Sequence, residues 1–149
     1  ATSLGLFLED ADAVAAVQEA RRVLRPGGRL LVEGMHRDDV VSAYSPRARW
    51  TLPDGTRVRA RRRFDALRGI SHEQLRWDGP LGRGEKRHAL RIRTATELTT
   101  LLRRAGLEVR EAWGGWGGER FRHDSERLVL LVNRAGNQWF TSVQPETVG

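Results

Sequence analysis

Two adjacent side chains, His36 and Arg37, are the first candidates for chemistry in this sequence. They follow an apolar run at 29–34, and ligands of open α/β sheets bind at the carboxyl ends of the strands. A histidine, with an ordinary pKa of about 6.5, can take a proton from a nucleophile. An arginine can clamp a carboxylate. We therefore predict catalytic roles for both residues, against the alternative that the His-Arg-Asp-Asp string is only a solvated cap.

The tryptophans suggest a second kind of site. Trp50, Trp77 and Trp113 are the residues that we predict to line an aromatic substrate pocket, with Trp116 near the last of them. The alternative is that Trp50 and Trp77 cover the apolar face of a sheet. The histidines that remain lack the spacing of metal ligands, so we predict no metal site; they are His72, His88 and His123.

The charge of the chain is strongly positive, at +7, yet Lys86 is the single lysine among 26 basic residues. Such a preference for arginine, with abundant alanine and glycine, is typical of a GC-rich genome. The arginines at 57, 59, 61 and 63 alternate with other residues as one face of a strand would. We interpret this stripe as a solvated face and expect no nucleic-acid partner, against the alternative that it binds an anionic substrate or RNA.

The composition indicates one globular domain. The chain has 149 residues, of which 39% are apolar, enough for one domain with a core. No apolar run approaches the roughly 20 residues of a membrane span, and acidic residues interrupt any signal-peptide pattern. The absence of cysteine excludes disulfides and cysteine-ligated metals. We therefore predict a cytoplasmic protein without a membrane partner.

The elements that must position these residues begin with a helix over 10–24, whose apolar stripe includes Ala13 and Val17 and is broadened by Val23. Pro26-Gly27-Gly28 ends that helix, and an apolar strand follows at 29–34. Because this strand does not alternate cleanly between apolar and polar residues, we predict that it is buried on both faces.

The middle of the chain predicts an antiparallel meander, and its end returns to the α/β rhythm. The meander comprises strands at 57–65, 69–78 and 86–93, separated by turn signals. Thr94 or Thr96 then caps a helix, which Gly106 terminates. The remaining elements are a strand at 107–113, a loop, a strongly apolar strand at 127–135 and a tail at 136–149.

The order of these elements and two motifs resemble the C-terminal half of a class I S-adenosylmethionine-dependent methyltransferase. Leu24-Arg25-Pro26-Gly27-Gly28 resembles the turn before the fifth strand of that family, and "TATELTTLLRRAGLEV" resembles the helix before its sixth strand. The resemblance makes 1–135 the C-terminal part of a methyltransferase domain. It implies an α/β fold with a partial Rossmann-like sheet, in which strands five, seven and six have the spatial order 5-7-6. The antiparallel meander is inserted at about 50–93.

The same resemblance implies that "TSLGLF" contacts the cofactor, through Ser3, Leu4 and Phe7, although an ordinary loop packed on the core is the alternative. Family members bind the cofactor mainly through a Gly-rich loop after the first strand and an acidic residue ending the second. Neither feature is present in this sequence. We therefore expect S-adenosylmethionine to be the cofactor of the complete enzyme, and we expect this chain to bind none alone.

A sheet reduced to these three strands leaves one edge of the 29–34 strand unpaired, and such edges pair with other chains. We expect a homo-oligomer or a complementing N-terminal half as partner. The predicted function is that of a methyltransferase segment acting on a small molecule, incomplete without its N-terminal half. Two other functions stay open: a basic α+β module that binds nucleic acid or an acidic partner, and a non-catalytic dimerisation remnant.

Overall fold

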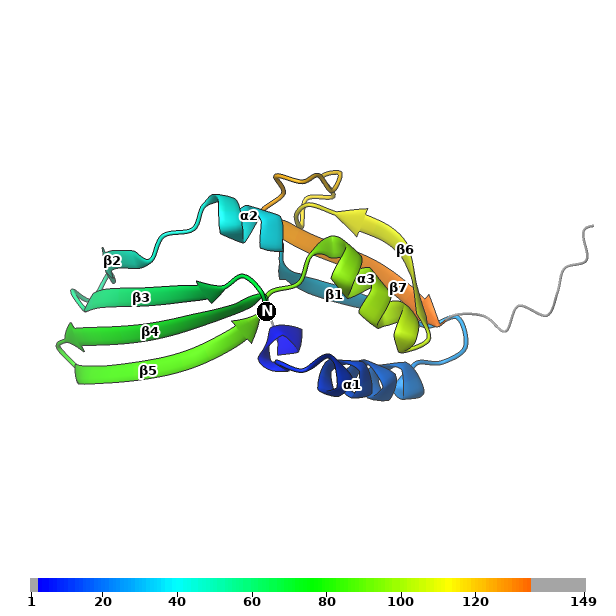
Figure 1. Cartoon of the computed structure of the whole chain (residues 1–149), viewed down its shortest axis with the longest axis horizontal. Coiled ribbons are helices and arrows are strands. Elements are labelled where there is room, and N and C mark those ends of the chain that lie inside the picture. Colours follow the sequence, from blue (N-terminus) through cyan, green and yellow to red (C-terminus); the bar gives the residue numbers. More distant parts are fainter. Residues whose placement is uncertain (1–2, 135–149) are drawn as a thin grey trace, which may run out of the picture.

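The computed structural model describes residues 3–134, which form two antiparallel sheets and three α-helices (Figure 1). The predicted tail at 136–149 lies outside the described residues. The elements, in chain order, are the 3-10 helix η1 (Ser3–Leu6), α1 (Asp10–Val23), β1 (Arg29–Met35), α2 (Arg37–Ser42), β2 (Arg47–Thr51), β3 (Arg57–Asp65), β4 (Ile70–Gly79), β5 (Gly82–Arg91), α3 (Ala95–Arg104), β6 (Leu107–Trp113) and β7 (Arg127–Arg134).

The ends of the two long helices follow from local sequence. α1 ends before Pro26-Gly27-Gly28, where the Gly28 amide donates to the Arg25 carbonyl at 2.8 Å and Gly27 has a φ of +72°. Thr94 caps α3, and Glu97 reaches back to the Thr94 amide in a capping box. Gly106, with a φ of +79°, follows α3 in the position that favours glycine. The predicted helix stop and cap are both confirmed.

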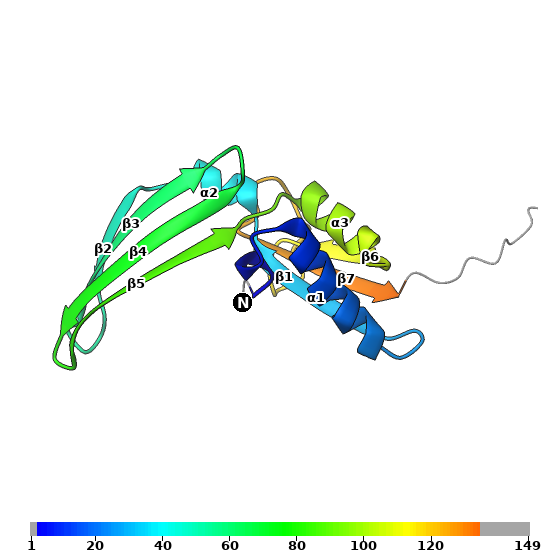
Figure 2. The same cartoon turned by 60° about the horizontal axis from the view of Figure 1, so that its bottom comes forward.

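The first sheet has the order β1-β7-β6, with β7 antiparallel to both neighbours. This is the spatial order that the sequence predicts for the three apolar strands. Both long helices pack on one face of this sheet, where Leu101 and Leu102 of α3 meet Val17 of α1 and Leu130 of β7 in the main core (Figure 2). Val23 lies outside this core and is 68% exposed, so the prediction that it broadens the buried stripe is wrong.

The other face of β1 is open, which corrects a second prediction. β1 was expected to be buried on both faces, but Leu31 is 52% exposed and Met35 is 40% exposed. Within residues 3–134, β1 pairs with β7 alone, and α1 and α3 cover only the face that carries Leu30 and Val32. In the described part of the chain, one edge of β1 has no strand partner, and Leu31 and Met35 expose apolar surface on the face turned away from the helices.

The second sheet has the order β2-β3-β4-β5, antiparallel throughout, and extends away from the first sheet as a curved arm (Figures 1 and 2). The predicted meander is confirmed, with one strand more than expected, since β2 pairs with β3 and brings the insertion forward to residue 47. One face of this sheet carries Val58, Ala60 and Trp77, and the other carries the alternating arginines of β3.

Candidate functional site

A pocket lies where the two sheets meet, and we call it the junction pocket. It has a volume of about 350 Å³ and lies beside the carboxyl end of β1. Its wall has two parts: α2 and the segment after it contribute apolar and hydroxyl groups, and the meander contributes a row of charged side chains. The principal lining residues are Met35, Val40, Tyr44, Arg62, Glu73 and His88. Volumes of a few hundred Å³ are typical of small-molecule sites.

The charged row of this pocket follows from strand register. Arg62 of β3 pairs with Glu73 of β4, which pairs in turn with His88 of β5, so the three side chains stand side by side on one face. Arg62 Nε donates to Glu73 Oε1 at 2.6 Å, and His88 Nε2 lies 3.3 Å from Glu73 Oε2. The Glu73 side chain is 17% exposed, so this network is shielded from bulk water on most sides.

The contact with Glu73 bears on whether His88 can act as a proton acceptor. When Nε2 carries the proton and donates to Glu73, Nδ1 keeps a lone pair that can accept a proton. In the described part of the chain, His88 Nδ1 is buried and has no hydrogen-bond partner. A carboxylate that orients a histidine, whose second nitrogen is left as acceptor, is the arrangement of a general base. The pair has the acceptor atom that a general base needs, and this atom is buried in the present conformation.

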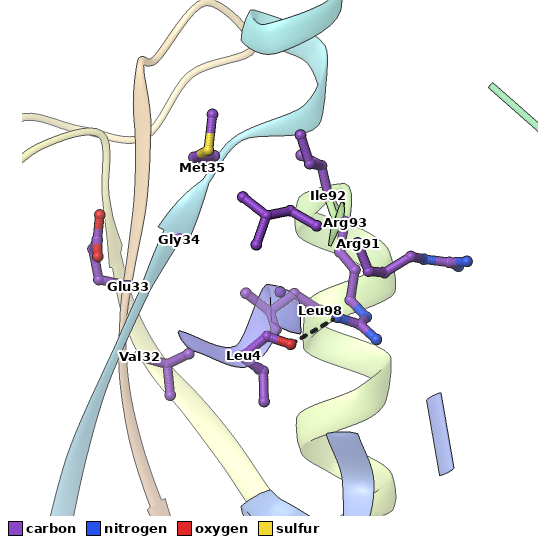
Figure 3. Close-up of a pocket in the computed structure, with 11 residues that line it drawn as sticks. Leu4, Val32, Glu33, Gly34, Met35, Arg91, Ile92, Arg93 and Leu98 are labelled. Atoms are coloured by element: carbon purple, nitrogen blue, oxygen red, sulfur yellow. Dashed lines mark hydrogen bonds between the residues drawn. The ribbon is translucent and has the colours of Figure 1, made fainter. Parts of the chain in front are cut away.

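A second, smaller pocket lies between η1, β1 and the link from β5 to α3 (Figure 3). Leu4, Val32 and Leu98 converge on it, and its volume is about 30 Å³. That volume is enough for about one water molecule. A nucleoside cofactor needs a site about ten times larger. This pocket by itself is therefore too small for S-adenosylmethionine.

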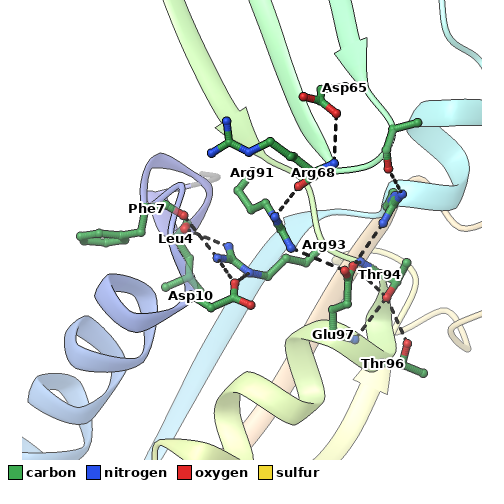
Figure 4. A network of polar contacts seen from close by, with 12 residues as sticks. Leu4, Phe7, Asp10, Asp65, Arg68, Arg91, Arg93, Thr94, Thr96 and Glu97 are labelled. Atoms are coloured by element: carbon green, nitrogen blue, oxygen red, sulfur yellow. Dashed lines mark hydrogen bonds and ion pairs between the residues drawn. The ribbon is translucent and has the colours of Figure 1, made fainter.

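Arg93 fixes the segment in which the cofactor-contacting residues were predicted (Figure 4). It is 5% exposed, and it donates to Asp10 Oδ1 from two nitrogens at 2.9 and 3.2 Å. It also donates to the carbonyls of Leu4 at 3.4 Å and Phe7 at 3.3 Å. Hydrogen bonding to Arg93 lowers the pKa of Asp10. One buried cation therefore joins η1 and the start of α1 to the end of the meander.

The residues predicted to contact cofactor lie around η1. Leu4 packs against the main core and lines the small pocket, whereas Ser3 is exposed and Phe7 is 38% exposed. The predicted contacts of Ser3, Leu4 and Phe7 with the cofactor stay a prediction.

His36 and Arg37 lie at the carboxyl end of β1, as predicted, but each makes contacts that are consistent with a structural role. His36 is 1% exposed, with Nδ1 3.3 Å from the Ser125 carbonyl and its ring edge-on to Phe121 at 4.8 Å. Arg37 donates to the Ala66 carbonyl at 2.9 Å. Neither residue lines the junction pocket. Their catalytic roles stay a prediction, and the geometry adds no support for it.

The three predicted substrate-binding tryptophans are not brought together. Trp50 and Trp77 flank Val58 on the apolar face of the second sheet, and they are 40% and 37% exposed. Trp113 ends β6 in the other sheet, where it pairs with Val129. Gly84 lies opposite Trp77, where a Cβ would come within 2.1 Å of the indole. The covering role that was the alternative for Trp50 and Trp77 fits this arrangement.

Sequence reasoning missed the residues that line the junction pocket. The alternation in β5 places His88 on one face with Leu90, but the register that sets it beside Glu73 involves another strand. Tyr44 follows the short helix α2 (Arg37–Ser42), which is too short to show a helical period in the sequence. Within residues 3–134, no group of three or more His, Cys, Asp or Glu side chains is arranged to hold a metal ion. No helix of that part is long and apolar enough to cross a membrane.

Comparison with solved structures places this fold among methyltransferases. The CcbJ methyltransferase from Streptomyces caelestis matches with a TM-score of 0.80 at 20% identity, over 91% of this chain and 58% of that one. An S-adenosylmethionine-dependent methyltransferase from Clostridium acetobutylicum matches with a TM-score of 0.81 at 12% identity, over 91% and 56%. The sugar N-methyltransferase KedS8 from Streptoalloteichus gives 0.63 at 17%, over 90% and 53%.

The chain therefore has the fold of a part of S-adenosylmethionine-dependent methyltransferases, and it spans little more than half of the length of these structures. No protein-family model matches the sequence, and no curated protein matches it.

Proposed function

We propose that this chain is the C-terminal part of a methyltransferase that uses S-adenosylmethionine and acts on a small molecule. In this proposal β1, β7 and β6 correspond to the fifth, seventh and sixth strands of the family sheet. The observation that carries the proposal is the sheet order β1-β7-β6, with both long helices on one face, in a chain that superposes on about half of two methyltransferases with TM-scores near 0.8.

The free edge of β1 is where the remaining strands of the sheet would be added. Backbone groups along this edge have no strand partner in the described chain, and Leu31 and Met35 expose apolar surface beside it. Edges of this kind bind further strands readily. A complementing N-terminal half would supply the fourth strand, the Gly-rich loop and most of the cofactor site. Ser3, Leu4 and Phe7 would contribute from this chain, in the segment that Arg93 holds in place.

The junction pocket is the proposed acceptor site. It lies beside the carboxyl end of β1. Ligands of open α/β sheets bind at the carboxyl ends of the strands. Its apolar wall would exclude water, and Glu73 would hold His88 in the tautomer that leaves Nδ1 free. His88 would accept the proton of an amine or hydroxyl nucleophile once the side chains that bury Nδ1 move aside. The relationship to a sugar N-methyltransferase supports a small polar acceptor.

The proposal is tested by isothermal titration of S-adenosylhomocysteine. The chain alone is expected to give no binding heat, since its own small pocket holds about 30 Å³. The chain mixed with an N-terminal half that carries a Gly-rich loop is expected to bind. No heat in either sample would contradict the proposal, as would binding that needs only a second copy of this chain.

A further inference from the structure

The second sheet has one face on which arginines predominate, and we call it the arginine face. It consists of the odd-numbered residues of β2, β3 and β5 and the even-numbered residues of β4, as the antiparallel register requires. Its exposed arginines come from all four strands: Arg47, Arg49, Arg57, Arg59, Arg61, Arg63, Arg76, Arg83 and Arg87. The face looks away from the junction pocket, whose charged row lies on the opposite side of the sheet.

Several of these arginines stand directly opposite one another. Arg59 of β3 pairs with Arg49 of β2 on one side and with Arg76 of β4 on the other. Arg47 likewise pairs with Arg61. Like charges at directly opposed positions destabilise an antiparallel sheet. The isolated sheet therefore carries an electrostatic cost that a bound anion would relieve.

Few carboxylates on this face offset that charge. Asp78 pairs with Arg57 and Arg83 at 3.3 and 3.1 Å. Glu85 accepts from Arg76 and Arg87, each at 2.7 Å. Hydrogen bonds from Gln74, Arg76 and Arg87 lower the pKa of Glu85 to about 2, so it stays ionised.

Asp65, at the end of β3, accepts from the Arg68 amide. Among the described residues, this leaves a band along β2 and β3 whose guanidinium groups have no carboxylate partner: Arg47, Arg49, Arg59, Arg61 and Arg63.

The face is also hollowed beside this band. A shallow pocket of about 490 Å³ includes Arg61, Arg63 and Arg87 in its lining, with His72, Gln74 and Ala89. Arg62, Glu73 and His88, which also line the junction pocket, complete the lining, so cations predominate over the single carboxylate. Such a concavity fits a group that carries several negative charges.

The aromatic residues of the sheet decide between the possible polyanions. Trp50, Phe64 and Trp77 all lie on the opposite face, so the arginine face has no Trp, Tyr or Phe on which bases could stack. Proteins that bind single-stranded nucleic acid rely on such stacking. The guanidinium fork matches carboxylates as well as phosphates, so the lack of stacking residues is what favours an acidic protein segment over a single-stranded nucleic acid. In an extended acidic segment every second side chain recurs at about 6.6 Å, which is also the spacing of alternate arginines along β3.

We propose that the arginine face binds an acidic segment of a partner protein. The proposal does not depend on the methyltransferase assignment, because it rests on the side chains of the outer face of the meander, whereas the charged row of the junction pocket lies on the opposite face.

The test is fluorescence anisotropy with a labelled oligoglutamate peptide and a labelled oligothymidine, both at low salt. The chain is expected to bind oligoglutamate more tightly than oligothymidine, with an affinity that falls steeply as salt is added. The double variant Arg59→Glu with Arg61→Glu should lose about tenfold or more in affinity for the peptide, since two central contacts become repulsive. Glu85→Gln should raise the affinity about twofold or more, because Arg76 and Arg87 are released for the ligand.

The matched control is Arg22→Glu with Arg120→Glu, which changes the net charge equally on exposed sites outside the arginine face. It should retain most of the affinity. The Arg59/Arg61 variant should also melt at a higher temperature than the unmodified chain, because it removes opposed like charges. A melting temperature at or above that of the unmodified chain then shows that the loss of binding does not come from misfolding. An equal loss of affinity in the control, tighter binding of oligothymidine, or no binding of oligoglutamate would each overturn the proposal.

Discussion

Replacing Arg93 by methionine should loosen the segment that leads into α1. The substitution keeps most of the apolar volume but removes a buried cation with four hydrogen bonds. Each of the carbonyls of Leu4 and Phe7 would lose a donor, at about 1 kcal/mol each. The ion pair with Asp10 adds only about 1 kcal/mol, because the Asp10 side chain is 48% exposed and screened by solvent. The free energy of unfolding should therefore fall by about 3 kcal/mol.

Urea unfolding followed by circular dichroism measures this loss, and amide hydrogen exchange locates it. Exchange of the amides at 4–10 should accelerate more than exchange in β4, since the side-chain hydrogen bonds of Arg93 lead to Leu4, Phe7 and Asp10. Asp10→Asn serves as the control, since it removes the charge and keeps the carbonyl contacts, and it should cost about 1 kcal/mol. A loss below about 0.5 kcal/mol in the Arg93→Met variant would refute the view that this residue anchors η1.

Three further outcomes follow from the same structure. Because Arg93 lowers the pKa of Asp10, the stability that this carboxylate contributes is present above its unfolded value of 3.8 and is lost as pH falls through the folded pKa; acid titration of unfolding should show this loss, and Asp10→Asn should lack it. Leu102→Ala, at a site that is 0% exposed, should cost about 3–4 kcal/mol in urea unfolding. Thr94→Ala should cost about 1 kcal/mol, whereas Thr96→Ala, outside the capping box, should cost clearly less.

Local signals in the sequence predicted much of the fold. Pro26-Gly27-Gly28 set the end of α1, Thr94 with Glu97 set the start of α3, and the alternation at 57–65 set the two faces of β3. These features depend on neighbouring residues along the chain, so they are visible in one sequence. The short elements α2 and β2 were missed because six and five residues are too few to show a period.

The candidate site was harder to predict because it depends on contacts between distant segments. His36 is a residue type that can act in proton transfer, but its ring is edge-on to Phe121, which is distant in the chain. His88 gains its potential role from Glu73 through strand register, and a single sequence does not state register. The burial of β1 was overestimated because its apolar composition is typical of a strand with a neighbour on each side. In the described chain β1 has one strand neighbour, β7.

In the proposed function, β1 offers the edge on which a methyltransferase sheet is completed. Leu31→Glu places a charge on the open face of β1 at a side chain that is 52% exposed, so the free chain should remain folded. Leu81→Glu, in the turn after β4 and 97% exposed, is the matched control. Circular dichroism checks that both variants fold like the unmodified chain.

The decisive measurement is the titration of S-adenosylhomocysteine into each variant in the presence of the N-terminal half. The unmodified chain and the Leu81→Glu variant should bind, and the Leu31→Glu variant should lose binding by about tenfold or more, because docking at β1 is impaired. Equal binding by all three chains would contradict the role of the β1 edge, and no binding by the unmodified chain would contradict the methyltransferase assignment.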